Sequence, residues 1–435
     1  MLTEEEGALI TKGAKEEKAA NAKAIKKAGK LSVSDAIDKA TVYGDVRVRY
    51  EDRQGNGENA TSAVDTNQTR DRARYKITAG VKTESGDWYS DLAFAMGANG
   101  RSDNATFGKT TGSLNDKETL YVKRAMVGYK ATDWLTVEAG RMDNPLYTTS
   151  MVWDADLTVE GLSEKAKYKL NDQTELFGLA GQWQYKGDRS LIDPLNSTSA
   201  VSTVTSELLA FQGGVKYAFN DRTSAKVAMT YSTITHNAGN GKFFTPGITN
   251  KALTASPGTN DLDTIEIPAE INYMATPSVG VRLFGDYVYN TSANDRYNHA
   301  IAQAGTDAAT VRAAGNDDVA WLLGVAVGSA KDLKAFEGNK MVAGDWSARL
   351  WYQDVGVYSV DQNAVDSDIN DSRVNMKGTA FKAQYNVQDN VLLNFTAAHA
   401  DRKNDLLAAA AGSGNDTTLN LKSFDLFQFD VTYKF

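Results

Sequence analysis

Charged residues at alternate positions are the feature of this sequence best suited to chemistry. Arg47 and Arg49 stand two residues apart, and so do Arg72, Arg74 and Lys76. In an extended strand, residues two apart point to the same side, so each group forms a basic stripe on one face. Guanidinium and ammonium groups in such stripes attract anions and steer them, but they break no bond by themselves. The pattern favours binding or passage of charged solutes over catalysis.

The residue types needed for covalent or metal chemistry are scarce. The chain has no cysteine, and its three histidines stand far apart. Thiolate nucleophiles, disulfides and cysteine-ligated metals are therefore excluded, and no metal-ligand spacing is found. No Gly-x-Ser-x-Gly segment or other nucleophile arrangement is present either. The net charge of -8 disfavours a nucleic-acid partner. We expect no enzyme, no metal and no cofactor.

Apolar and polar residues alternate with a period of two from Tyr43 onward. Val46, Val48 and Tyr50 stand between the charged residues of the first such segment. The pattern predicts strands with one apolar and one charged face. No run of about 18 apolar residues is present, so a transmembrane helix is excluded. About sixteen strands are expected, at approximately 43–51, 72–82, 87–97, 119–131, 134–142, 157–170, 173–186, 205–219, 222–236, 260–275, 278–290, 316–329, 343–357, 371–387, 390–402 and 420–435.

The connections between these strands fall into two classes. Short polar turns, such as 85–87 and 220–221, alternate with long segments rich in Gly, Asn, Asp, Ser and Thr, such as 98–118 and 237–259. Short and long connections therefore lie at opposite ends of the strands. This asymmetry, with an even strand number, is typical of an outer-membrane barrel. The sequence predicts an all-β fold, a 16-stranded antiparallel transmembrane β-barrel.

Aromatic residues favour this barrel over a soluble β-sandwich. Sandwich strands are shorter, and their apolar faces meet in a core of large aliphatic residues. Here aromatic residues gather near strand ends on the apolar face, as in the interfacial girdles of a barrel. The residues assigned to these girdles are Trp88, Trp134, Trp183, Tyr185, Tyr217, Phe219, Tyr273, Tyr287, Tyr289, Trp321 and Trp346.

The last strand carries apolar residues at every second position up to the end of the sequence. These residues are Phe427, Phe429, Val431, Tyr433 and Phe435. A terminal phenylalanine on such a strand resembles the assembly signal of bacterial outer-membrane proteins. In a soluble protein, an exposed aromatic final strand would be an aggregation hazard. We expect Phe435 to engage the barrel-assembly machinery, and the barrel to contact lipid and lipopolysaccharide in the bacterial outer membrane. The first residues lack an apolar segment of signal-peptide length, so a mature form is expected.

The segment 140–161 resembles a motif of the bacterial "putative porin" family. It contains Gly-Arg at 140–141, Asn-Pro-Leu at 144–146, Trp-Asp-Ala-Asp at 153–156 and Glu-Gly at 160–161. The openings of the first two strands and the aromatic terminus also match. The resemblance covers the chain from about residue 43 onward. It implies a sixteen-stranded, trimeric porin, distantly similar to phosphate-selective porins.

The first forty residues differ from the remainder of the chain. They are rich in Ala, Lys and Glu, which favour helix, but their apolar side is thin. A solvated helix, a coiled coil joining subunits, and a segment that plugs the pore or anchors a periplasmic partner remain open. We therefore divide the chain into a helical segment, 1–40, and a barrel, 41–435.

A barrel of sixteen strands encloses a water-filled lumen, and inward side chains set its selectivity. Strand alternation predicts roughly three basic to two acidic side chains on the inner face. The excess acid is expected in the long loops, for example at Asp361, Asp366 and Asp368. The candidate pore-lining residues are Arg47, Arg49, Arg72, Arg74, Lys76, Arg124, Glu138, Arg141, Lys165 and Lys167.

The segment 143–156 is the third long connection, the one that porins commonly fold into the lumen. An ordinary extracellular loop is the alternative, and the longer segments 237–259 and 291–315 are further candidates for closing the pore. The candidate constriction residues are Asp143, Trp153, Asp154, Asp156 and Glu160, beside Arg141.

These observations predict a porin for passive diffusion of small hydrophilic solutes, with mild anion preference. A near-neutral general pore is the closest alternative. A barrel-borne hydrolase lacks the nucleophile constellation that it needs. A structural role, in which the N-terminal helix plugs the lumen or binds a periplasmic partner, is the third possibility.

Overall fold

The structure is a computed structural model. It describes residues 37–57, 68–97, 102–108, 117–186, 206–235, 262–303, 308–329, 342–362, 364–366, 368–369, 373–406 and 421–435. None of the helices in these ranges is long and apolar enough to cross a lipid bilayer. The predicted N-terminal helix lies almost wholly outside the described residues. The first strand begins at Lys39, two residues before the boundary expected from the sequence.

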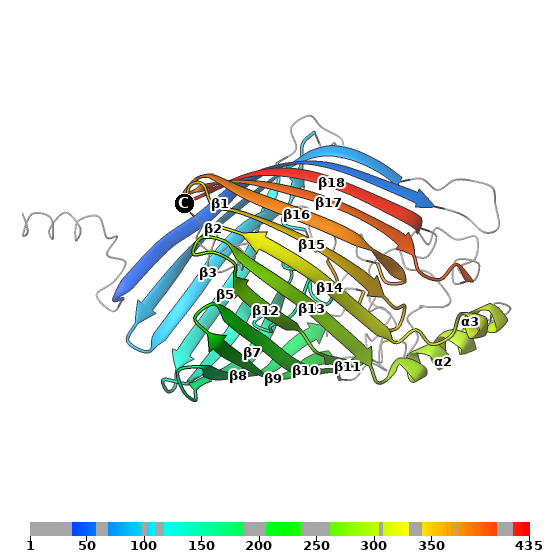
Figure 1. Cartoon of the computed structure of the whole chain (residues 1–435), viewed down its shortest axis with the longest axis horizontal. Helices are drawn as coiled ribbons and strands as arrows, with labels where there is room; N and C mark the ends of the chain where they lie inside the picture. The colour runs from blue at the N-terminus through cyan, green and yellow to red at the C-terminus, as the bar shows by residue number, and fades with distance from the viewer. Residues whose placement is uncertain are drawn as a thin grey trace, which may run out of the picture.

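The described residues form one antiparallel sheet that closes on itself (Figure 1). The strand segments are β1 (Lys39–Gly57), β2 (Gln68–Ser85), β3 (Trp88–Gly97), β4 (Ala105–Thr106), β5 (Thr119–Lys130), β6 (Leu135–Asp143), β7 (Thr158–Lys169), β8 (Thr174–Lys186), β9 (Ser206–Asn220), β10 (Thr223–Ile234), β11 (Asp263–Glu266), β12 (Ala269–Met274), β13 (Gly280–Asn290), β14 (Val319–Gly328), β15 (Trp346–Val355), β16 (Met376–Gln388), β17 (Val391–Arg402) and β18 (Leu421–Lys434). β11 and β12 both pair with β10 and β13, so they are two halves of one strand interrupted at 267–268. β4 is a short piece of the connection between β3 and β5. The described chain therefore forms sixteen full strands, and the predicted fold class is confirmed.

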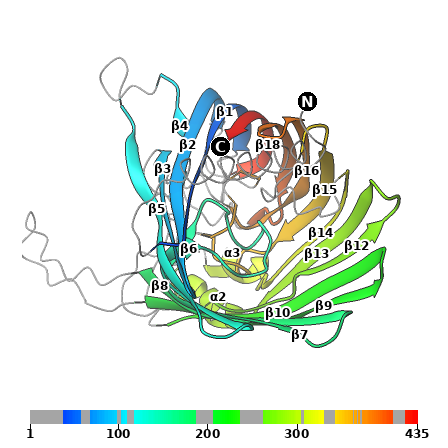
Figure 2. The ribbon, with the colours of Figure 1, turned by 90° about the vertical axis from the view of Figure 1, so that its left-hand side faces the viewer.

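Closure joins the first strand to the last. β1 pairs with β2 on one side and with β18 on the other. At the seam, the Phe435 amide donates to the Gly44 carbonyl at 3.0 Å, and the Gly44 amide donates back at 2.9 Å. The Phe435 ring lies where a side chain at residue 44 would stand, so a glycine is required there. Because no strand edge is left unpaired at this seam, the ring of strands is complete (Figure 2).

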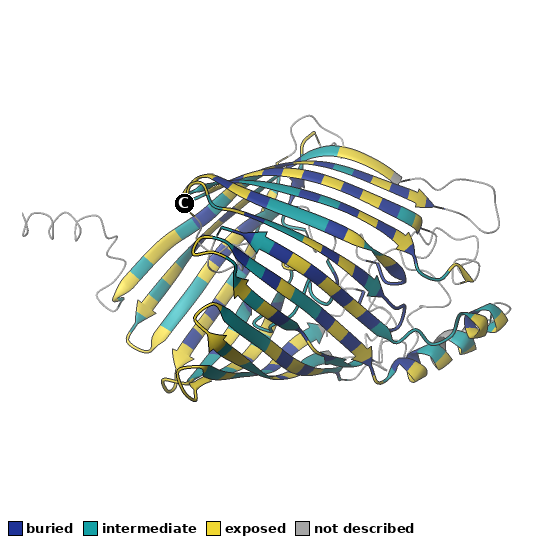
Figure 3. Ribbon diagram, viewed as in Figure 1, coloured by how far each residue is buried: buried dark blue, intermediate teal, exposed yellow. Residues whose placement is uncertain are grey.

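Buried and exposed residues alternate along the strands, as the banding in Figure 3 shows, and the faces of the wall are reversed relative to a soluble protein. On β1, Val46, Val48 and Tyr50 are 38 to 46% exposed, whereas Arg49 is 5% and Glu51 is 0% exposed. The same alternation runs through the other strands. Apolar residues face outward on most strands, whereas the inward faces are strongly charged on β1 and β2 and carry buried apolar residues, such as Leu322 and Trp351, on β14 and β15. An apolar exterior of this kind requires lipid or another apolar environment.

Most of the predicted girdle aromatics lie on the exterior, for example Trp88 and Trp134 at 55% and 48% exposed. Two do not. Trp183 is 1% exposed, and its indole N–H donates to the Ser163 hydroxyl at 2.9 Å inside the barrel. Tyr185 donates its hydroxyl to Asp361, also inside. The prediction was wrong at these two positions because in β8 the aliphatic Leu176, not the aromatic residues, is on the outward side.

The two ends of the barrel carry different connections. Short turns, such as 86–87 and 221–222, join the strands at one end. Long connections lie at the other, and one of them forms α2 (Ala293–Gln303) and α3 (Ala308–Ala314), which project at the right of Figure 1. Two other long connections, 144–157 and 356–375, contact the inner wall. The barrel therefore positions a site inside the lumen.

Candidate functional site

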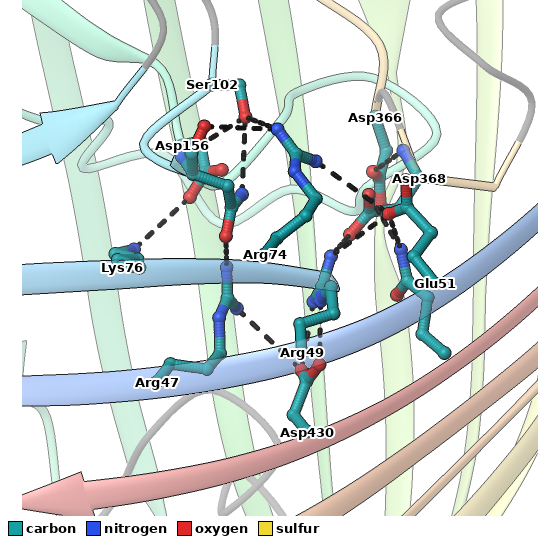
Figure 4. Close-up of polar contacts among 12 residues, drawn as sticks. Arg47, Arg49, Glu51, Arg74, Lys76, Ser102, Asp156, Asp366, Asp368 and Asp430 are labelled. Carbon is teal, nitrogen blue, oxygen red and sulfur yellow. Dashed lines mark hydrogen bonds and ion pairs between the residues drawn. The ribbon is translucent and has the colours of Figure 1, made fainter. Parts of the chain in front are cut away.

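A stripe of basic side chains lines the inner wall on β1 and β2. We call it the arginine wall: Arg47, Arg49, Arg53, Arg72, Arg74 and Lys76. Pairing of the two strands places Arg49 beside Arg74 and Arg47 beside Lys76. Like charges at facing positions repel, so this stripe needs carboxylates among its members. Figure 4 shows where they come from.

Glu51 is the carboxylate at the centre of the arginine wall. It is fully buried, and its Oε1 lies 2.6 Å from Arg72 and 2.9 Å from Arg53. Its Oε2 lies 3.8 Å from Arg49 and 3.7 Å from Arg74. A buried carboxylate is costly unless it is paired and hydrogen-bonded, as this one is. Glu51 therefore neutralises part of a dense positive field and fixes the arginine side chains in place.

Two further carboxylates hold Arg49 from different elements. Asp430 of β18 binds its guanidinium with two bonds, 2.7 Å and 2.9 Å long. Asp368, from the connection 356–375, lies 3.1 Å from Arg49 and 2.9 Å from Arg53. Burial opposes ionisation of Asp368, but Arg49 and Arg53 more than offset it and hold the pKa of this carboxyl group well below its usual range. Asp368 therefore stays charged and ties its loop to the wall.

The connection 144–157, here called the constriction loop, enters the interior and contacts the wall at β9. The Tyr147 amide donates to the Gln212 side chain of β9 at 3.0 Å, and Gln212 donates back to the Tyr147 carbonyl at 2.9 Å. Met151 is 1% exposed and packs with apolar residues inside the barrel. Trp153 packs against a second apolar cluster that contains Met142 and Trp183. The loop is therefore held inside the lumen by both polar and apolar contacts.

The constriction loop also meets the connection 356–375, here called the second loop. The Asp154 amide donates to the Ala364 carbonyl at 2.6 Å, and the Asp366 amide donates to the Ser150 carbonyl at 3.1 Å. On one side the second loop reaches Tyr185 of β8, and on the other it reaches Arg49. The two loops together span the interior between opposite walls.

Asp156 brings the constriction loop to the arginine wall. Its carboxylate lies 3.6 Å from Lys76, whose ammonium is also 3.2 Å from Asp103 of the connection before β5. Burial opposes ionisation of Asp156, but Lys76 and Arg47 lower the pKa of this carboxyl group. Asp156 is therefore a fixed negative charge opposite a positive wall.

A cavity of about 610 Å³ lies beside these loops. Its lining contains five basic residues: Arg47, Arg49, Arg282, Arg349 and Lys382. Loop carboxylates, including Asp154 and Asp156, complete the lining. A charged ion in this cavity experiences positive walls and negative loops at once. Its basic members are therefore candidates for setting ion selectivity.

Four other predicted lumen residues, Arg124, Glu138, Lys165 and Lys167, do not line this cavity, although Arg124 pairs with Asp143, which does. Arg124 lies 3.0 Å from Asp91 and 2.7 Å from Asp143, which ends β6. Glu138 is 7% exposed and pairs with Lys165. Lys167 stands near the turn end of β7, with its side chain 70% exposed and 3.4 Å from Glu175. These residues do not meet the arginine wall in one site.

Arg141 and Glu160 lie differently from the prediction. They face each other on β6 and β7 and form an ion pair. Met142 and Val159, their chain neighbours, are 3% and 4% exposed and pack inside with Trp153. Adjacent residues of a strand point to opposite faces. Arg141 and Glu160 therefore lie on the outer face near the loop end of the wall. The prediction that they line the lumen was wrong, because they stand next to inward-facing residues on their strands.

The second loop is the part of the site that the sequence reading missed. Asp361, Asp366 and Asp368 were expected in external loops, but they contact groups inside the barrel. A signal was present, because this loop is not uniformly polar. Its apolar residues are buried against β14 to β18, namely Val357, Tyr358, Val360, Val365, Ile369 and Val374. Of the other candidates for closing the pore, 237–259 lies outside the described residues. The segment 291–315 forms α2 and α3, which contact the same apolar cluster through Ala293 and Val311.

Comparison with protein families finds one match. A family described as "Putative porin" matches residues 61–250, which include the constriction loop and the whole motif at 140–161. The resemblance recognised in the sequence is confirmed over this range. No curated protein sequence is significantly similar to the chain.

Two solved structures illustrate similarity at the level of coordinates. The outer membrane channel DcaP of Acinetobacter baumannii aligns with a TM-score of 0.45 and 12% identity, covering 92% of this chain and 99% of that one. The high-pH structure of Pseudomonas putida OprB aligns with a TM-score of 0.49 and 8% identity, covering 91% of this chain and 94% of that one.

Proposed function

We propose that this chain is an outer-membrane porin, a water-filled channel through which small hydrophilic solutes diffuse passively. The observation that carries the proposal is the reversed wall: Val48 and Phe427 are 46% and 43% exposed outside, whereas Arg49 and Glu51 are buried inside. A closed barrel with an apolar exterior fits a bilayer, and a charged interior of sixteen strands holds water. The match to a porin family supports the same function.

The narrowest part of this channel is formed by the constriction loop and the second loop. Both reach the arginine wall, through Asp156 and Asp368 respectively. Solutes therefore pass a zone where fixed negative charges on the loops face fixed positive charges on the wall. Such a transverse field orders water and selects dipolar or charged solutes by their orientation.

The channel prefers anions weakly. The arginine wall contributes six basic side chains, which are paired with five carboxylates, those of Glu51, Asp103, Asp156, Asp368 and Asp430. The local excess is a single positive charge, so the preference is small. Three further basic groups line the cavity, Arg282, Arg349 and Lys382, together with four further carboxylates, Asp143, Asp154, Glu270 and Asp366, so the proposed preference rests on the arginine wall.

Planar-bilayer recording of the purified protein tests this function. We expect stable ion-conducting steps and, under a salt gradient, a reversal potential of the sign that indicates anion flow. In liposome-swelling assays, small neutral sugars should enter. Absence of conductance contradicts the porin function, and clear cation preference contradicts the selectivity.

The assembled protein is a homotrimer in contact with outer-membrane lipid and lipopolysaccharide. The proposal rests on the family resemblance and on the apolar exterior. Phe435, 54% exposed beside the seam, is the residue that the barrel-assembly machinery recognises. Native mass spectrometry in detergent should give three chains per particle, and a monomer would contradict this assembly.

A further inference from the structure

Several charged groups around the 610 Å³ cavity already have partners of opposite charge. Arg49 is bound to Asp430 at 2.7 Å and to Asp368 at 3.1 Å. Arg282 lies 3.4 Å from Glu270. The two charges of such a pair largely cancel for a solute in the lumen. Recognition of a particular solute therefore depends more on charged groups of the lining that have no such partner.

Lys382 of β16 is a basic group of this kind. Its half-buried side chain lines the cavity and forms no ion pair within the described part of the chain. The strand register places it opposite Arg349 of β15 on one side and opposite Thr396 of β17 on the other. Like charges at directly opposite positions repel each other. An anionic group in the cavity in front of Lys382 and Arg349 therefore lowers the energy of this part of the wall.

Asp366 of the second loop is the acidic counterpart of Lys382. It lines the same cavity, is half-buried, and makes no ion pair with any residue that the structure describes. Its amide donates to the Ser150 carbonyl at 3.1 Å, and its Oδ1 accepts from the Asp368 amide at 2.7 Å, so its position is fixed. Figure 4 shows it beside Asp368. Asp366 Oδ2 accepts no hydrogen bond from the described residues, so it can accept one from a solute.

The cavity has room for a solute that reaches both groups. Its volume of about 610 Å³ lies within the ordinary range for small-molecule sites. The charged ends of an extended dipeptide stand about 7 Å apart, which a cavity of this volume accommodates. Tyr147, Trp153 and Trp351 also belong to the lining and offer apolar surface to the part of a solute between its charges. The site therefore combines one positive group, one negative group and apolar surface.

We propose that this cavity binds small zwitterions, solutes of the class of amino acids and short peptides that carry an ammonium group at one end and a carboxylate at the other. The carboxylate binds Lys382, and the ammonium group binds Asp366. The inference rests on the porin function, because the cavity is part of the channel. One ionic contact at about 4 Å in water changes affinity about fivefold. A zwitterion makes two such contacts, a simple anion or cation makes one, and a neutral solute makes none.

Block of the ion current by four solutes of similar size tests the proposal on the wild-type protein. Glycylglycine is a zwitterion, N-acetylglycine an anion, glycylglycinamide a cation and N-acetylglycinamide neutral. Single channels are recorded at neutral pH in dilute salt, which limits screening. We expect half-block by glycylglycine at a concentration about 25-fold lower than by N-acetylglycinamide, since two contacts are gained. The two singly charged solutes should lie between them.

Two substitutions separate the ends of the site. Lys382→Gln should weaken block by glycylglycine and N-acetylglycine about fivefold, but not block by glycylglycinamide. Asp366→Asn should weaken block by glycylglycine and glycylglycinamide to the same extent, but not block by N-acetylglycine. A change in the general field of the lumen would instead act on the two singly charged solutes in opposite directions and leave the zwitterion unaffected. The crossed pattern therefore reports direct contact.

Matched substitutions at an exposed turn serve as controls. Lys169 and Asp172 form an ion pair 2.9 Å long outside the cavity, and their side chains are 66% and 100% exposed. Lys169→Gln and Asp172→Asn make the same chemical changes as the two test substitutions. Both should keep the wild-type blocking concentrations for all four solutes.

The outcomes distinguish failure of this site from failure of the porin function. If the wild-type protein does not conduct, the porin function itself is wrong. If it conducts but N-acetylglycinamide or N-acetylglycine blocks as strongly as glycylglycine, the zwitterion site is wrong and the porin function stands. Unchanged block by glycylglycine in folded Lys382→Gln and Asp366→Asn channels also overturns the site. The wild-type comparison needs no substitution, so it decides the question even if a variant does not fold.

Discussion

Replacing Asp368 by asparagine is the most direct test of how the loops and the arginine wall set selectivity. Asp368 lies 3.1 Å from Arg49, 2.9 Å from Arg53 and 3.1 Å from Gln428. Asparagine keeps the size and an acceptor oxygen but removes the negative charge. Arg49 retains Asp430, and Arg53 retains Glu51, so the wall stays partly paired.

Two magnitudes follow from this geometry. Breaking one partner of a fully buried ion pair costs about 3–5 kcal/mol. The Asp368 side chain is 22% exposed, and its partners keep other carboxylates. We therefore expect a loss of about 1–3 kcal/mol in the free energy of unfolding. The electrostatic energy between the Asp368 charge and a permeating ion about 10 Å away in water is about 0.4 kcal/mol. Loss of this charge stabilises an anion and destabilises a cation by that amount each, so the ratio of their permeabilities shifts about fourfold. Salt screening reduces the shift to about two- to fourfold.

The assay is the reversal potential across a planar bilayer under a salt gradient. Asp368→Asn should move it toward stronger anion preference at low salt, and the shift should shrink as ionic strength rises. Asp172→Asn removes a fully exposed turn carboxylate paired with Lys169 and should leave selectivity unchanged. An unchanged ratio, or a shift toward cations, in a correctly folded Asp368→Asn channel refutes the reasoning.

Four other predictions test separate parts of the structure. Burial raises the pKa of Asp366, so as the pH falls this carboxyl group should take up a proton before an ordinary aspartate does. Anion preference and folding stability should both increase as it becomes protonated, whereas Asp366→Asn should show neither change in reversal potentials or urea unfolding. Val48→Arg places a charge on the lipid face and should cost about 2–4 kcal/mol in unfolding from vesicles; an unaltered stability would contradict the membrane-facing assignment. Gly140 has φ of 121°, and an added Cβ would lie 2.2 Å from a carbonyl oxygen. Gly140→Ala should therefore destabilise the barrel by about 1–3 kcal/mol in detergent unfolding, whereas Gly213→Ala, which has open space, should not. Phe435→Ala should slow insertion by purified barrel-assembly machinery; equal insertion rates would remove Phe435 from that role.

The strands could be predicted from the sequence because their signal is local. Alternation of Val46, Val48 and Tyr50 with charged residues fixes which side chains share a face, whatever the remainder of the chain does. The same parity argument correctly places Arg47 and Arg49 together inside. Applied to Glu138 and Arg141, three residues apart on one strand, it also places Arg141 on the opposite face from Glu138.

The interior arrangement of the loops depended on contacts that no local pattern contains. Asp368 meets Arg49 across 319 positions of the chain, and Thr149 meets Asp286 across 137. Which loop enters the lumen is decided by the energies of such distant pairs together with the apolar packing of the second loop. Composition indicated only that these loops were long and acidic.

The sequence by itself determined a cylinder of alternating strands, its two faces and its aromatic final strand, because these follow from the pleat of a single chain segment. The tertiary structure alone decided where the bore narrows and which carboxylates oppose the arginine wall. The physical reason is that the electrostatic energy of a charge inside the lumen depends mainly on the charged groups close to it. Closure of the barrel brings these groups together from positions that are distant in sequence.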